Sequence, residues 1–235
     1  MKHTSALIVG AGSGLSASLA RAFTTAGMSV ALAARSAAKL DEFAAATGAR
    51  TFNCDAAQRD EVEKLFVDLD AAGQTPDVVV YNASYRTRGP FTDLDPVEVE
   101  KAIAITAYGA FLVAQAAAKR MLPRIQQGVG HGAILFTGAS ASVKGYAQSA
   151  PFAMGKFALR GLAQSMAREL SQHGIHVCHF VIDGGIRSER RPEPADNPDS
   201  LMDPDAIAAS YLHVLSQPRS AWTSELELRP WVEKF

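Results

Sequence analysis

The sequence predicts a doubly wound, Rossmann-like α/β fold, in which a parallel sheet lies between two layers of helices in a single domain over residues 1–235. Short apolar runs alternate with longer stretches whose apolar residues lie three and four apart. The composition agrees, because 48% hydrophobic and 20% charged residues are typical of a globular protein. At 235 residues, one such sheet with helices on both faces can use the whole chain.

The short apolar runs indicate buried parallel strands, since a strand covered on both faces needs no alternating polar positions. They lie at residues 6–9, 30–33, 78–81, 133–136 and 176–182. The intervening stretches have the spacing expected of crossover helices between parallel strands. The clearest are residues 16–26, 97–121 and 157–170.

Two later segments are predicted to lie outside this alternation. Residues 187–204 are rich in Pro, Asp, Glu and Arg, which predicts a loop. The loop is either a solvated excursion or a cover over the substrate, since loops after the carboxyl ends of strands border the ligand crevice. Residues 221–235 alternate apolar and polar side chains. This pattern predicts an edge strand and an arm whose Trp231 and Phe235 pack against a neighbour.

The charge balance favours small-molecule chemistry. A net charge of −1 and a pI near 6.6 offer no broad basic field for nucleic acid or an anionic membrane surface. The apolar run at the N-terminus ends at Gly10, too early for a signal peptide or a membrane span. Cys54 and Cys178 are far apart in apolar surroundings, which fits reduced thiols and a cytoplasmic location.

A glycine-rich turn follows the first predicted strand and opens the first predicted helix. It contains Gly10, Ser13, Gly14 and Leu15. Glycines let the backbone approach a pyrophosphate, whose charge is stabilised by free N–H groups at the helix start. We therefore expect these four residues to bind a dinucleotide; the alternative is a tight turn without a ligand.

The end of the second predicted strand indicates which dinucleotide binds. An acid at that place would accept a hydrogen bond from the ribose 2′-hydroxyl of NAD, but the residue is Ala34. Arg35 follows, with Lys39 nearby, and these cations suit a 2′-phosphate. The sequence thus predicts NADP(H) in preference to NAD(H), with a solvated Arg35 as the alternative.

The turn resembles the Thr-Gly-x-x-x-Gly-x-Gly motif of the short-chain dehydrogenase/reductase family, with Val9 in place of Thr and Ser16 in place of the last Gly. Tyr81-Asn-Ala-Ser84 resembles the family's Asn-Asn-Ala-Gly turn, and Asp183-Gly-Gly-Ile186-Arg-Ser188 resembles its Pro-Gly-x-x-x-Thr segment. The resemblance implies that these segments contact the cofactor. By this resemblance, Asp55 lies at the adenine, Asn82 and Ala83 lie at the turn beside the cofactor, and Ile186 lies near the nicotinamide carboxamide.

The family's catalytic residues are largely replaced. Its Tyr-x-x-x-Lys pair corresponds to Phe152 and Lys156, and its Ser corresponds to Ala139, one place before Ser140. Its Asn on the long helix corresponds to Thr106. The resemblance assigns Lys156 to the nicotinamide ribose, with Ser140, Phe152 and Thr106 completing the candidate catalytic set. Phe152 cannot transfer a proton, so ketone reduction through that position is excluded.

Two functions remain open at this stage. The first is an oxidoreductase acting on a small organic substrate, in which Ser140, Ser142, Tyr85, Tyr146 or water supplies the proton. An activated double bond or an imine would not need an acid at position 152. The second is a catalytically inactive NADP(H)-binding protein or redox sensor.

The remaining patterns concern metal binding and assembly. His173, His176 and His179 show no ligand spacing with Cys or acids, so no metal is expected. The Ala-rich stretches 102–118 and 158–170 are suited to close helix packing. The family resemblance implies a homodimer or homotetramer through these helices.

Overall fold

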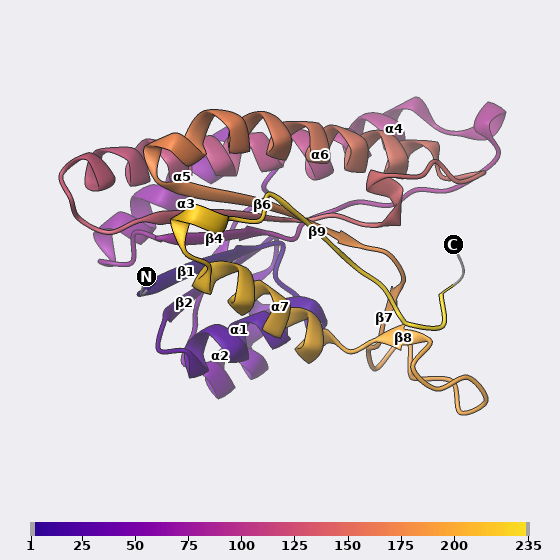
Figure 1. Ribbon diagram of the computed structural model, residues 1–235. Coiled ribbons are helices and arrows are strands. Elements are labelled where there is room, and N and C mark those ends of the chain that lie inside the picture. Colours follow the sequence, from indigo (N-terminus) through magenta and orange to yellow (C-terminus); the bar gives the residue numbers. More distant parts are fainter. Residues whose placement is uncertain (1–2, 234–235) are drawn as a thin grey trace.

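The computed structural model describes residues 3–233 and contains a seven-stranded parallel sheet in the order β3-β2-β1-β4-β5-β6-β9 (Figure 1). The bounds are β1 Ser5–Val9, β2 Ser29–Ala34, β3 Arg50–Asn53, β4 Val78–Tyr81, β5 Gly132–Thr137, β6 Ile175–Ile182 and β9 Glu225–Leu228. The central strands are buried along their whole length, as their unbroken apolar runs require. The predicted doubly wound fold is confirmed.

Helices cover both faces of the sheet (Figure 1). The apolar core on one face includes residues of α3 (Arg59–Ala71), α5 (Gly109–Gln126) and α6 (Ala150–Leu170). The opposite core includes α1 (Leu15–Thr25), α2 (Asp41–Thr47) and α7 (Pro204–Ser216). Helix α4 (Pro96–Ile103) packs on α6 and continues into α5 through a π-helical turn, Ala104–Tyr108. Short 3₁₀ turns lie at Ala37–Leu40, Phe91–Asp93, Ser140–Ser142, Ser171–His173 and Arg219–Ala221.

The strand order determines where a ligand crevice is expected. From β1 the chain moves outward through β2 and β3, then returns to place β4 on the other side of β1. The loops at the carboxyl ends of β1 and β4 therefore lead away from each other, and ligands of open α/β sheets bind at such a switch point. The glycine turn follows β1, and Asn82 follows β4.

The continuous helical stretch Pro96–Gln126 is long and apolar enough to cross a membrane by length and composition alone. More than half of its most apolar window is buried inside the fold. It packs against α3, α6 and the sheet, as the core helix of a globular protein does.

The structure corrects part of the loop prediction for residues 187–204 and places a strand in the C-terminal segment. Within the predicted loop 187–204, Leu201–Met202 forms a short strand, β8, that pairs in parallel with β7 (Gly185–Ile186). The pairing joins segments distant in sequence, so local composition does not show it. The predicted edge strand is present as β9 beside β6. The Trp231 side chain is 81% exposed in the single chain, and Phe235 lies outside the described residues.

Candidate functional site

The glycine turn is held against the two strands that flank β1. Gly10 has a φ of +81°, and a Cβ atom there would lie 2.3 Å from the backbone N of Ala83. The N–H groups of Gly10 and Ala11 both donate to the Ala33 carbonyl, at 2.9 and 3.0 Å. A residue with a side chain would therefore force the turn apart, so glycine is required at position 10.

The first turn of α1 is available to an anion. Gly14 precedes the helix, and among residues 3–233 no side chain caps its N-terminus. Position 14 has open space around it, since a Cβ there would meet no described atom within 4 Å. Free N–H groups and the helix dipole both favour a phosphate at such an end.

Asn82 connects the turn to β4. Its N–H donates to the Val9 carbonyl at 2.8 Å, and its Nδ2 donates to Ser16 Oγ at 2.8 Å. Ser16 Oγ in turn donates to the Gly10 carbonyl at 3.4 Å. Ser16, which stands at the family's last glycine, thus links the turn to Asn82, and sequence reasoning did not assign it this role.

The first of two cavities, here called the turn cavity, has a volume of about 830 Å³. It is bounded by the glycine turn and by the carboxyl ends of β2, β3 and β4. It brings together the predicted cofactor residues Gly10, Ser13, Arg35, Asp55, Asn82 and Ala83. Lys39 and Arg190 also line it. Arg190 was not predicted, because it comes from the loop that follows β7.

The second cavity, here called the Phe152 cavity, has a volume of about 800 Å³. It brings together the predicted residues Gly14, Leu15, Asn82, Ser140, Phe152, Lys156 and Ile186. Both cavities include Asn82 and Ser84, so they adjoin along the carboxyl ends of the strands and together make up the candidate crevice. This arrangement suits an elongated ligand with phosphates at the turn and a reactive end near Lys156. The residues that line the two cavities therefore fit a dinucleotide.

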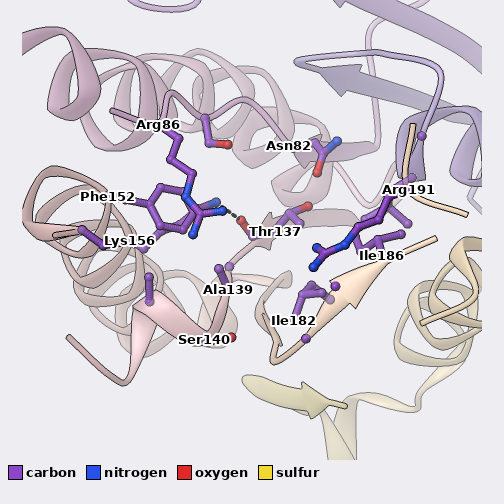
Figure 2. Close-up of a pocket in the computed structure, with 18 of the residues that line it drawn as sticks. Asn82, Arg86, Thr137, Ala139, Ser140, Phe152, Lys156, Ile182, Ile186 and Arg191 are labelled. Atoms are coloured by element: carbon purple, nitrogen blue, oxygen red, sulfur yellow. Dashed lines mark hydrogen bonds between the residues drawn. The ribbon is translucent and has the colours of Figure 1, made fainter. Parts of the chain in front are cut away.

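Lys156 is the most strongly perturbed cation of the site. Its side chain is buried, and Nζ donates to the Thr137 carbonyl at 2.7 Å (Figure 2). Burial lowers the pKa of Lys156 to about 7. At neutral pH a substantial fraction of the Lys156 side chains is therefore uncharged, and a nearby anion would favour the charged form.

Phe152 lies one helical turn before Lys156 and carries a cation over its ring. The Arg86 guanidinium carbon is 4.7 Å from the ring centroid, and Lys156 Nζ is 5.8 Å from it. Figure 2 shows Arg86 and Arg191 reaching into the cavity from different sides. Burial, followed by the charges of Arg88 and Arg191, lowers the pKa of Arg86.

The candidate proton donors occupy different environments. Tyr146 is half exposed and lines the Phe152 cavity, as does Ser140. Ser140 donates a hydrogen bond to the buried carboxylate of Asp183, which also accepts from Lys144 Nζ at 3.0 Å. Ser142 is fully buried, and its Oγ accepts from the Ala139 N–H.

The structure places the other two candidates outside both cavities. Tyr85 donates its hydroxyl to Glu98. Thr106 is fully buried in the π-helical turn, where its Oγ1 accepts from the Tyr85 N–H at 3.3 Å. It packs against Gly155 of α6, so its position favours a structural contact between two helices.

The Phe152 cavity is also lined by residues that sequence reasoning missed. Arg86, Arg88, Arg187 and Arg191 all line it. Arg86 and Arg88 follow the Asn82 turn by a few residues, and this proximity is a signal that could have been used. Arg191 could not be placed, since its position depends on the fold of the loop after β7.

Comparisons with known proteins agree with this geometry. A family model described as short chain dehydrogenase matches residues 4–196. The solved short-chain dehydrogenase from Rhodopseudomonas palustris is 33% identical, with a TM-score of 0.81 over 97% of this chain and 99% of that chain. An uncharacterized oxidoreductase of Staphylococcus aureus is 26% identical over 234 residues, covering 96% of each protein. A variant of actinorhodin polyketide ketoreductase, solved with NADPH, shares the fold at 20% identity, with a TM-score of 0.85 over 97% of this chain and 96% of that chain.

The chain therefore belongs to the short-chain dehydrogenase family and is an oxidoreductase of that family. Membership implies a nicotinamide cofactor and a small-molecule substrate.

Proposed function

We propose that this protein is an NADP(H)-dependent oxidoreductase that acts on a carbonyl, activated C=C or imine substrate without a tyrosine acid. The observation that carries the proposal is the pair of adjoining cavities, with the glycine turn in one and Lys156 beside Phe152 in the other. The bound nicotinamide would supply or accept the hydride.

The residues that would hold the cofactor are divided between the two cavities. Gly10, Ser13, Gly14 and Leu15 would hold the pyrophosphate, and Arg35 with Lys39 would hold the 2′-phosphate. Asp55 and Ala83 would border the adenosine half, and Asn82 the junction of the cavities. Lys156 would hold the nicotinamide ribose, and Ile186 the carboxamide.

The proton must come from a group other than Phe152. Tyr146 and Ser140 are the hydroxyl-bearing candidates in the cavity, and solvent can enter through its open mouth. Ser140 is committed to Asp183, which weakens it as a donor. We therefore favour Tyr146 or water, with substrates whose reduction needs no strong acid.

The alternative is an inactive NADP(H)-binding protein or redox sensor. Phe152 and Ala139 favour it, since neither side chain can donate a proton or polarise a substrate oxygen. A panel of ketones, enones and imines, screened for NADPH consumption after binding is shown by fluorescence, separates the two functions. Turnover of enones or imines supports the proposal. Tight NADPH binding without turnover, with turnover appearing only in Phe152→Tyr, supports the alternative.

The organisation around this site is also proposed. We infer one domain over residues 1–235, with segment 187–204 bordering the substrate, since Arg187, Ser188 and Arg191 line the Phe152 cavity. We propose a cytoplasmic homodimer or homotetramer, with segment 221–235 as an arm whose exposed Trp231 packs on a neighbour. Light scattering of the wild type and Trp231→Ser tests the arm.

A further inference from the structure

The Phe152 cavity differs in charge from the protein as a whole. Four arginines and Lys156 line it, and none of its described lining residues is acidic. The whole chain has a net charge of −1. Burial, followed by the charges of Arg88 and Arg191, lowers the pKa of Arg86, and a bound anion would offset both effects.

Three of these arginines have no acidic partner within residues 3–233. Arg187 is paired with Asp203 at 3.0 Å, but Arg86, Arg88 and Arg191 form no ion pair with a described residue. Other exposed arginines of the chain, such as Arg21 and Arg59, do form such pairs. Three arginines without an ion-pair partner among the described residues therefore line the cavity that a substrate would enter.

Two of the three guanidinium groups are placed by packing. The Arg86 guanidinium lies over the Phe152 ring, and this cation–π contact helps to hold it in place. Arg191 lies against the backbone of Gly185, where a Cβ atom would be 2.6 Å from Nη1. Arg191 is also held by paired backbone hydrogen bonds with Ser188, each 3.0 Å long. Such positioning reduces the entropy lost when an anion binds.

We propose that the substrate carries an oxyanion, a carboxylate or a phosphate monoester, which Arg86 and Arg191 bind beside Phe152 while Arg88 adds to the attraction. The inference rests on the proposed function, because it names the substrate class of the same site. Guanidinium groups bind both oxyanions through paired N–H donors. In this proposal, Phe152 holds Arg86 in position instead of acting as a proton donor.

The experiment compares matched probes on the free protein and on the protein with NADPH, using isothermal titration calorimetry. One pair is 4-oxopentanoate and its methyl ester; the other is dihydroxyacetone phosphate and dihydroxyacetone. The anionic member of at least one pair should bind about tenfold or more tightly than its neutral partner. Preference for only the carboxylate or only the phosphate identifies which oxyanion is used. Equal binding within both pairs overturns the proposal.

Arg86→Gln and Arg191→Gln should each remove most of that preference, while Arg86→Lys should retain part of it, because charge remains but the paired donors are lost. Arg168→Gln, an exposed position on α6 outside the cavity, serves as the control and should bind like the wild type. If Arg86→Gln keeps the preference, or if it weakens NADPH binding as much as anion binding, the assignment to substrate is wrong. If NADPH does not bind but the anion preference persists and depends on Arg86, the cofactor proposal fails and the anion site stands.

Discussion

The two halves of the crevice follow different rules. In the turn cavity, backbone geometry shapes the candidate binding site: Gly10 allows the turn, no described side chain caps α1, and Ser16 and Asn82 link the turn to the end of β4. In the Phe152 cavity, side chains determine the chemistry, and most of the family's catalytic side chains are replaced. The comparison indicates that the side chains of the Phe152 cavity can be replaced while the backbone of the glycine turn stays as the fold requires.

The largest effect is expected at the turn. Gly10→Ala should destabilise the protein by about 3 kcal/mol and abolish NADPH binding, since it combines a left-handed backbone with a clash against Ala83. Urea unfolding measures the first effect and fluorescence titration the second. Gly27→Ala is the matched control, because Gly27 also has a positive φ but open space around it. Equal losses in the two variants would show that the contact with Ala83 contributes nothing.

Lys156, which lines the Phe152 cavity, should make the stability of the protein depend on pH. Its pKa is about 7 in the folded protein and has an ordinary value of 10.5, so between these pH values the unfolded chain binds more protons. The free energy of unfolding should therefore rise with pH, by about 2 kcal/mol from pH 7 to pH 9 from this group. Urea unfolding across this range, without NADPH, measures the rise. Lys156→Met should lack it, and an identical slope in the variant would contradict the buried, depressed pKa.

Arg35→Ala tests whether the turn cavity distinguishes NADPH from NADH. NADPH should bind about tenfold more weakly, and NADH affinity should be nearly unchanged, because only NADPH has a 2′-phosphate. Fluorescence titration with both cofactors measures this ratio. Arg59→Ala, on the exposed face of α3, is the control. Equal weakening toward the two cofactors would place Arg35 away from the 2′-phosphate.

The smallest effect is expected at Ser16. Ser16→Ala should cost about 1 kcal/mol of stability, because the buried hydroxyl links Asn82 to the Gly10 carbonyl. Urea unfolding against Ser210→Ala measures the difference, because the Ser210 hydroxyl donates to the Ala206 carbonyl of the same helix in a solvent-exposed hydrogen bond. A loss no larger than that of the control would mean that the two strands are held together without this link.

Local patterns predicted most of the turn cavity, Arg190 excepted. The glycine turn, Arg35 and Asn82 each follow directly from the end of a buried strand, and parallel strands bring such ends to one edge. Thr106 shows where the same reasoning lost precision. Its place on the long helix was predicted, but only packing against Gly155 shows that it is buried outside the cavities.

The amino-acid sequence was sufficient to predict the doubly wound sheet, most of its buried strands and the glycine turn, because burial and backbone freedom depend on local residue types. The charge of the Phe152 cavity, in contrast, depends on the tertiary structure. Arg86 comes from the segment after β4 and Arg191 from the segment after β7, and they line the same cavity only when the sheet places both at its carboxyl edge. Electrostatic surroundings depend on distances between segments far apart along the chain, and no local pattern contains those distances.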